Sequence, residues 1–338
     1  MFRTMEAARL ETLHVVSDPS GLQALVAIHS SRLGPALGGC RYLSYPSEES
    51  ALRDVVRLAA SMSRKAALAG LPLGGGKAVI LRPPYVASRA ALFEVFGRFV
   101  DRLGGHFIAA IDSGTSSADM DCIARHTRHV ACTSEEGDPA PHTALGVFAG
   151  IRATALARLG SDNLEDLRIA IQGLGKVGYA LAEQLHAAGA ELLVSDPDPG
   201  RVRLAVEAFG AHPLPCAELL CTPCDILAPC ALGGVLDAPT IAHLRCAAVA
   251  GAANDQLVSE DLAEQLEARG ILYAPDYVIN AGGLIHAYYS HQGASSGVVA
   301  EHLLQIPQRL TDLYAHAQAE HCSPAWVAQQ QADRLLYG

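Results

Sequence analysis

The segment Gly173–Gly178, with the sequence GLGKVG, constrains the fold of this 338-residue chain more than any other stretch. It lies between a short apolar segment of strand length, residues 168–172, and a segment with a helical pattern that runs to Ala188. A second apolar segment, residues 191–195, is followed by Asp196. This order of strand, glycine-rich turn, helix, strand and terminal acid is typical of a parallel α/β sheet that binds a dinucleotide.

Each glycine of this segment has a physical role in that interpretation. Gly173 allows the tight turn after the strand, Gly175 lets a pyrophosphate approach the backbone, and Gly178 lets the helix pack closely on the strand. The helix would begin at Lys176 and Val177, where its N-terminus directs a partial positive charge toward the phosphates. We therefore predict an α/β fold with a Rossmann-type, doubly wound nucleotide-binding domain.

Polar residues near the ends of the predicted strands indicate which dinucleotide binds. Asp196 would accept hydrogen bonds from the adenosine ribose diol and repel a 2′-phosphate, which favours NAD over NADP. Arg201 is close enough in sequence to leave NADP open. Asn254 and Asn280 lie at or a little beyond the C-terminal ends of later strands, the edge of the sheet that faces the cofactor, so both join the predicted cofactor site. Thr143, at the start of a predicted helix, is assigned to the same site. The later strands are predicted at residues 226–228, 247–250 and 271–274.

The segment 135–141, EEGDPAP, is polar and contains two prolines, and it marks the predicted boundary between two domains. We assign residues 1–138 to an N-terminal mixed α/β domain for substrate binding and oligomerisation. Residues 139–317 form the predicted nucleotide-binding domain. Helices at about residues 318–338 are expected to return to the first domain.

Composition and charge narrow the class of partner. The net charge is −10 and the isoelectric point is about 5.7, which argues against a nucleic acid or an anionic membrane as partner. No run approaches the ~18 apolar residues that a membrane span needs. The first residues lack the apolar core of a secretory signal. We expect a cytoplasmic protein that binds a small molecule.

Nine cysteines, an odd number, stand mostly in apolar contexts, which suits reduced thiols better than a disulfide framework. Cys216, Cys221, Cys224 and Cys230 include one C-x-x-C spacing. Because the spacings of this group are irregular, a structural zinc site is the weaker alternative. We expect no metal.

Lysine is rare in this chain, and its positions indicate where chemistry occurs. Only three of the 25 basic residues are lysines, Lys65, Lys77 and Lys176, and the others are arginines. An arginine cannot lose its proton in a protein, whereas burial or a neighbouring cation can push a lysine amine toward neutrality. Lys65 and Lys77 flank Gly74–Gly76, interpreted as a glycine-rich turn that lets a substrate approach the backbone. The alternative is a surface turn with two solvated lysines.

Asp112 follows a predicted strand at residues 106–111, a common position for a functional carboxylate. The alternative is that it only caps the following turn. The other elements predicted in this half are a strand at residues 22–29, a turn-rich loop at 30–39, a helix from about 47 that brings Lys65 to its far end, a strand at 78–81, and helices at 88–103 and 118–128.

Several long motifs, in this order, resemble the Glu/Leu/Phe/Val dehydrogenase family over essentially the whole chain. They are LGPALGG (33–39), MSRKAALAGLPLGGGKAVI (62–80), DSGTSSADMD (112–121), GLGKVG (173–178), CDILAPCALGG (224–234), AGAANDQL (250–257) and APDYVINAGG (274–283). The resemblance implies that Lys65 holds the substrate carboxylate, Lys77 is the catalytic lysine and Asp112 is its proton partner. The residues implied to hold NAD are Gly173, Gly175, Gly178, Asp196, Asn254 and Asn280.

Two positions depart from the family pattern. The family usually has an acid before the catalytic aspartate, where this chain has Ile111. An aromatic residue commonly precedes the carboxylate-binding lysine, where this chain has Arg64. Neither departure removes a group named above.

The resemblance implies reversible, NAD-dependent oxidative deamination of an L-amino acid to a 2-oxo acid and ammonia. Hydride would pass from Cα to the nicotinamide, and water would then attack the iminium. A general base must activate that water near neutral pH, and Lys77 with Asp112 fits this role.

The expected side-chain pocket is apolar. The family's glutamate enzymes place a lysine near the LGPALGG motif, where this chain offers Leu37. The predicted substrate-binding residues besides Lys65 are Leu37, Gly38, Ala110, Leu284 and Ala287. Leucine, valine and isoleucine are the expected substrates, and because Ala287 leaves space, an aromatic amino acid is the alternative. A catalytically inactive nucleotide-binding sensor is a third possibility. We expect a homo-oligomer.

Overall fold

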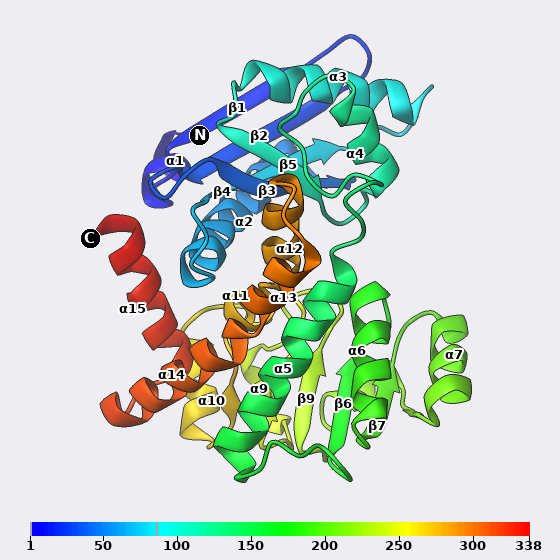
Figure 1. Cartoon of the computed structure of the whole chain (residues 1–338), viewed down its shortest axis with the longest axis vertical. Coiled ribbons are helices and arrows are strands. Elements are labelled where there is room, and N and C mark those ends of the chain that lie inside the picture. The colour runs from blue at the N-terminus through cyan, green and yellow to red at the C-terminus, as the bar shows by residue number, and fades with distance from the viewer. Residues whose placement is uncertain (1, 86) are drawn as a thin grey trace. The chain divides into compact units, whose positions relative to one another are not determined.

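The computed structural model describes residues 2–85 and 87–338, and the chain forms two compact units that we describe separately (Figure 1). Unit 1 contains residues 1–138, 284–296 and 332–338, and unit 2 contains residues 139–283 and 297–331. The boundary at 138 falls inside the predicted segment 135–141. Of the segment expected to return at 318–338, only residues 332–338 group with unit 1, and residues 284–296 join them.

The difference arises because helices near the C-terminus continue across the boundary between the units. These helices are α12 (Gly282–His291), α13 (Ser296–Leu303) and α15 (Pro324–Tyr337). Which ligand each unit binds stays a prediction.

Unit 1 contains a mixed five-stranded sheet with the order β1-β2-β4-β3-β5. Strand β2 is antiparallel to β1 and β4, whereas β3 is parallel to both β4 and β5. The strands are β1 (Thr12–Ser17), β2 (Gln23–Ser30), β3 (Ala36–Leu43), β4 (Gly74–Leu81) and β5 (Phe107–Ile111). The other helices of this unit are α1 (Phe2–Ala7), α2 (Glu48–Leu68), α3 (Arg89–Arg102) and α4 (Ser117–Ala124).

Two predictions for this half were wrong. The predicted loop at residues 30–39 contains the start of β3, which is a strand because β4 and β5 pair with it on both sides. The predicted glycine turn is the start of β4, and its glycines are buried in the sheet. A Cβ on Gly75 would lie 2.0 Å from the backbone nitrogen of Ser63 in α2, so this glycine allows a helix, and not a substrate, to approach the strand.

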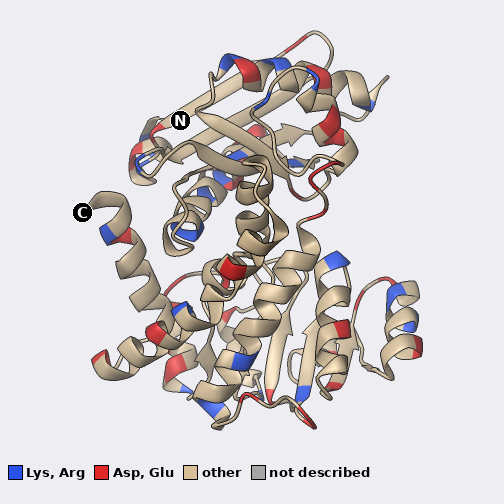
Figure 2. Ribbon diagram, in the orientation of Figure 1, with Lys and Arg blue, Asp and Glu red and all other residues tan. Residues whose placement is uncertain are grey.

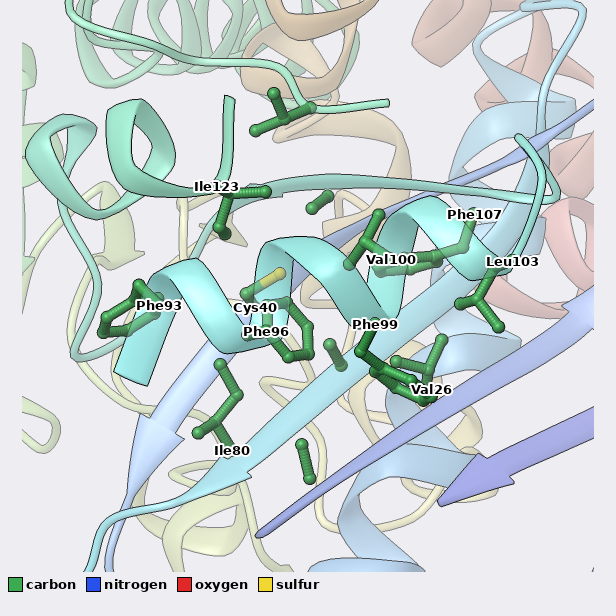
Figure 3. Close-up of a cluster of buried hydrophobic side chains, with 14 of the residues drawn as sticks. Val26, Cys40, Ile80, Phe93, Phe96, Phe99, Val100, Leu103, Phe107 and Ile123 are labelled. Carbon is green, nitrogen blue, oxygen red and sulfur yellow. The ribbon is translucent and has the colours of Figure 1, made fainter. Parts of the chain in front are cut away.

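Helix α3 covers one face of the unit 1 sheet with its aromatic residues. Phe93 and Phe96 are fully buried, and they pack in one cluster with Val26 of β2 and Ile80 of β4 (Figure 3). Burial of each such side chain contributes about 1.5–3 kcal/mol. This cluster fixes the strands that carry the candidate site.

Helix α2 packs on the sheet through Val55 and Ala59, which cluster with Val79 of β4. Ser47 caps its N-terminus by accepting a hydrogen bond from the backbone N–H of Ser50. Lys65 lies in the last turn, as predicted, where a cation is favoured by the helix dipole.

Unit 2 contains a six-stranded parallel sheet with the order β11-β10-β9-β6-β7-β8, the doubly wound arrangement that was predicted. Its strands are β6 (Arg168–Gln172), β7 (Glu191–Ser195), β8 (His212–Pro213), β9 (Ile226–Pro229), β10 (Ala248–Val249) and β11 (Leu272–Tyr273). Its helices are α5 (Ala140–Leu159), α6 (Lys176–Ala187), α7 (Pro199–Phe209), α8 (Cys216–Leu219), α9 (Ala238–His243), α10 (Leu262–Ala268), α11 (Asp276–Ile279) and α14 (Gln305–Glu320).

Figure 2 shows acidic and basic residues interspersed along the helices of both units. Within residues 2–85 and 87–338, no helix is long and apolar enough to cross a membrane.

Candidate active site

Lys77 and Asp112 form a buried ion pair in unit 1, between Nζ of the lysine and Oδ2 of the aspartate. Lys77 lies in β4, and Asp112 directly follows β5. Strand β3 runs between these two strands, and it has Gly38 and Gly39 at this level. A Cβ on Gly39 would lie 2.6 Å from Cβ of Asp112. The lysine and the aspartate therefore meet because the strand between them has no side chain there.

Asp112 also caps the turn that follows it, so the alternative role predicted for it is present as well. Its Oδ1 accepts a hydrogen bond from the backbone N–H of Ser113 at 2.7 Å. Its own N–H donates to Oγ1 of Thr115 at 2.9 Å. The turn orients the carboxylate, and Oδ2 is the oxygen that meets Lys77.

The pKa of Asp112 lies below its usual value. Burial acts to raise this pKa, but the positive charges of Lys77 and Arg41 and the hydrogen bonds to Asp112 lower it by more. The carboxylate is therefore ionised at neutral pH and can accept a hydrogen bond from the lysine.

Arg41 is a residue near this pair that the sequence analysis missed. Its Nε lies 3.5 Å from Oδ2 of Asp112, and its NH1 donates to Oδ2 of Asp54 at 2.9 Å. Because almost every basic residue in this chain is an arginine, the sequence alone does not single out Arg41 as a functional residue. The pairing of Cys40 with Ile111 across β3 and β5, which brings Arg41 beside Asp112, becomes visible only in the sheet.

Lys65 and Lys77 are both buried, with 7% and 5% of their surfaces exposed. The alternative of two solvated lysines on a surface turn was therefore wrong. Two residues before Lys65, Ser63 makes a hydrogen bond of 2.8 Å between its Oγ and Nδ1 of the buried His29. This bond fixes the last turns of α2, from which Lys65 extends.

The predicted side-chain pocket residues all belong to unit 1 and lie in β3, β5 and α12. Nδ1 of His291, at the end of α12, lies 3.0 Å from the carbonyl oxygen of Val130, and Val130 forms a bridge with Ala109 of β5. Ala287 precedes His291 by one helical turn, so both lie on the same side of α12. The end of α12 is thereby connected to the segment that bridges to β5. The apolar side chains of this group are buried: Leu37, Ala110, Leu284 and Ala287.

The glycine-rich turn of unit 2 has the geometry that dinucleotide binding requires. Gly173 has a φ of +95°, and a Cβ on Gly178 would lie 2.0 Å from the carbonyl oxygen of Gly173. A Cβ on Gly175 would meet nothing within 4 Å, so the space above it is open. Lys176 and Val177 begin α6, whose N-terminal N–H groups lie at this open side. The turn fits a pyrophosphate.

Asp196 holds this turn in place. Its Oδ2 accepts a hydrogen bond of 2.7 Å from the backbone N–H of Leu174, and its Oδ1 accepts one of 2.8 Å from Asp198. NH1 of Arg201 lies 3.7 Å from the same Oδ2. The acid and the nearby cation are both present where a ribose would bind.

Asn254 and Asn280 meet in unit 2, as a shared cofactor role requires. Nδ2 of Asn280 donates to Oδ1 of Asn254 at 2.9 Å. Oδ1 of Asn280 is buried and has no hydrogen-bond partner in the part of the chain that the structure describes, so it suits a donor from a bound ligand. Thr143 lies against Gly283, where a Cβ would come 2.6 Å from its Oγ1. The residues of unit 2 fit a dinucleotide.

No group of three or more metal-ligating side chains occurs among the described residues. All nine cysteines are free thiols. Burial raises the pKa of both Cys224 and Cys230 to about 12, so their thiols stay protonated at neutral pH.

A doubly wound sheet with a glycine-rich turn, in a chain that also has a buried lysine–aspartate pair, is typical of a dinucleotide-dependent oxidoreductase. Two family models match the chain. The first, described as Glu/Leu/Phe/Val dehydrogenase, dimerisation domain, matches residues 10–129, and the second, Glutamate/Leucine/Phenylalanine/Valine dehydrogenase, matches residues 200–332.

Curated relatives and a solved structure agree with these matches. The chain is 43% identical to leucine dehydrogenase from Geobacillus stearothermophilus, over 99% of this chain and 92% of the relative. It is 45% identical to an L-tryptophan dehydrogenase from Nostoc punctiforme, over 85% of this chain and 82% of the relative. The crystal structure of L-tryptophan dehydrogenase from Nostoc punctiforme matches with a TM-score of 0.83 and 39% identity, covering 99% of this chain and 98% of that one.

The chain therefore belongs to the Glu/Leu/Phe/Val dehydrogenase family and is a leucine dehydrogenase-like amino-acid dehydrogenase. This family uses NAD(P). Because relatives named for leucine and for tryptophan have similar identity to this chain, the comparisons leave the amino acid open.

Proposed function

We propose that this protein catalyses the reversible, NAD-dependent oxidative deamination of an apolar L-amino acid, with leucine, valine and isoleucine as substrates. The observation that carries the proposal is the buried Lys77–Asp112 pair in the same unit as the apolar, buried Leu37. The dimerisation-domain match supports a homo-oligomer as the working form.

The roles of the unit 1 residues follow from their chemistry. Lys65, a buried cation, would bind the substrate carboxylate. Lys77 would take a proton from the water that attacks the iminium, and the ionised carboxylate of Asp112 would receive it in turn. NAD, held by the glycine-rich turn, Asp196, Asn254, Asn280 and Thr143, would supply the hydride acceptor.

The preference for an apolar amino acid rests on Leu37. A glutamate side chain placed against Leu37 and Ala110 would bury a carboxylate without a cation, at a cost of several kcal/mol. Glutamate should therefore be a very poor substrate. Asp196 supports NAD over NADP, although Arg201 at 3.7 Å from it reduces the repulsion of a 2′-phosphate.

An aromatic amino acid is the second candidate substrate, because the small residue Ala287 is buried at the predicted pocket. The experiment is a comparison of kcat/KM, followed by NADH absorbance, for leucine, valine, phenylalanine, tryptophan and glutamate. We expect the highest kcat/KM for leucine and valine and a very low kcat/KM for glutamate.

The variant Ala287→Val should reduce kcat/KM for phenylalanine about tenfold more than for valine, because the added methyl groups fill space that only a ring needs. An equal effect on both substrates would place Ala287 outside the pocket. A wild-type preference for glutamate would overturn the whole assignment, and a protein that binds NADH but oxidises no amino acid would be a nucleotide sensor.

A further inference from the structure

We propose that Arg41 is a positioning residue for the Lys77–Asp112 pair, and that it sets the pH at which this pair becomes active. The inference rests on the proposed function, because it assigns the pair to proton transfer. Arg41 acts through Asp112 and has no assigned contact with the substrate.

The geometry places Arg41 on the same oxygen that Lys77 uses. Arg41 belongs to β3, the strand between those that lead to Lys77 and Asp112. Its Nε lies 3.5 Å from Oδ2 of Asp112, and within the described residues this Nε makes no hydrogen bond. The side chain of Arg41 is 16% exposed and that of Asp112 is 12% exposed, so water screens this contact only weakly.

Asp54 of α2 holds the other end of the guanidinium. Its Oδ2 accepts hydrogen bonds from NH1 of Arg41 at 2.9 Å and from the hydroxyl of Tyr45 at 2.7 Å. Its Oδ1 accepts a bond of 2.8 Å from NH2 of Arg57. Because three donors fix Asp54, Arg41 is held with Nε toward Asp112.

The charges around Asp112 then fix the sign of the effect. Lys77 and Arg41 face its carboxylate, Asp54 faces Arg41, and Cys40 nearby is neutral because burial raises its pKa to about 12. Lys77 meets Asp112 at Oδ2, the same oxygen that Arg41 approaches, so the charge of Arg41 acts on the two residues as a group. Removing the cation at position 41 favours every protonated form of the group. Removing the anion at position 54 favours the deprotonated forms.

The first test is the pH profile of kcat/KM for leucine. Arg41→Met should move the acidic limb to higher pH by about one unit, and Asp54→Asn should move it to lower pH. Arg57→Met is the matched control: it also removes one arginine bonded to Asp54, but the Arg57 side chain is 52% exposed, so water screens its charge and the acidic limb should keep its position. Arg41→Lys keeps the positive charge, so the acidic limb should stay at the same pH. Its kcat should fall, because one ammonium group cannot replace the planar guanidinium between two carboxylates.

A second readout needs no turnover. The chain has only three lysines, so acylation with acetic anhydride can be followed at Lys65, Lys77 and Lys176 by peptide mass spectrometry. Only a neutral amine reacts, so Arg41→Met should label Lys77 more slowly at pH 8, relative to Lys176 in unit 2. Circular dichroism and NADH binding show whether each variant is folded. If Arg41→Met does not fold, Asp54→Asn provides the test, because it should shift the acidic limb and the labelling rate of Lys77 in the opposite direction.

A folded Arg41→Met with an unchanged acidic limb and unchanged labelling of Lys77 would overturn the proposal. So would the same shift in Arg57→Met, since the effect would then come from net charge. If the wild-type protein oxidises no amino acid, the proposed function fails, and the labelling experiment alone still decides the role of Arg41.

Discussion

At the scale of single residues, substitutions of Lys77 can separate two roles of its side chain, the positive charge and the transfer of a proton. Lys77→Arg keeps a cation beside Asp112 but cannot give up its proton, so we expect kcat for leucine to fall by about 10²–10⁴-fold. Lys77→Ala should abolish turnover. NADH binding, measured by fluorescence titration, should persist in both variants, because the predicted cofactor residues belong to unit 2.

The opposite outcome is equally informative. An arginine variant with substantial activity would mean that position 77 contributes charge alone, and the general-base role would be lost. An arginine variant that no longer binds NADH would point to a folding defect instead.

The same residues explain why sequence reasoning found one part of the site and missed another. Lys77 stood out because lysine is rare in the chain, and Asp112 stood out because it follows an apolar strand. Arg41 follows Cys40, just after a stretch at residues 30–39 that has the composition of a loop. Its importance depends on the register of β3 against β5, and register arises from long-range pairing that no local pattern encodes.

At the scale of elements, glycines in β3 and β4 let a helix, two strands and an aspartate side chain come together. Triple glycine favours turns when it is considered alone, and that is why the start of β4 was predicted as a turn. Tertiary context decides otherwise: β4 has β2 on one side and β3 on the other, and α2 covers it at Gly75. The turn at Gly173–Gly178 was predicted correctly as the link between a strand and a helix, because both neighbouring elements are local in sequence.

The variant Gly75→Ala tests this packing. Its Cβ would come 2.0 Å from the nitrogen and 2.4 Å from Cα of Ser63, so the backbone of α2 must move. We expect a loss of about 3 kcal/mol in the free energy of unfolding, measured by urea denaturation with circular dichroism. KM for leucine should rise as well, because Lys65 lies two residues beyond Ser63.

A matched control is Gly200→Ala in the first turn of α7. There the nearest atom to a new Cβ is a side-chain oxygen of Asp198 at 3.1 Å, and alanine favours the helix, so stability should change by about 1 kcal/mol or less. If Gly75→Ala were as mild as this control, α2 could shift freely on β4, and the close approach would have no role in placing Lys65.

At the scale of the whole molecule, the predicted substrate residues and the predicted cofactor residues fall in different compact units. Mutations in separate units with no shared partners are expected to act additively. Cofactor preference should therefore change without any change in amino-acid preference.

Asp196→Ser makes this division measurable. It removes the negative charge that opposes a 2′-phosphate while Arg201 remains, so the ratio of kcat/KM with NAD to that with NADP should fall roughly tenfold. It also removes the acceptor for the N–H of Leu174, so KM for both cofactors should rise as the glycine-rich turn loosens. The ratio of kcat/KM for leucine to that for phenylalanine should stay the same.

A wild-type enzyme that already prefers NADP would contradict the role of Asp196. A changed leucine-to-phenylalanine ratio would show instead that the two units do not select their ligands independently.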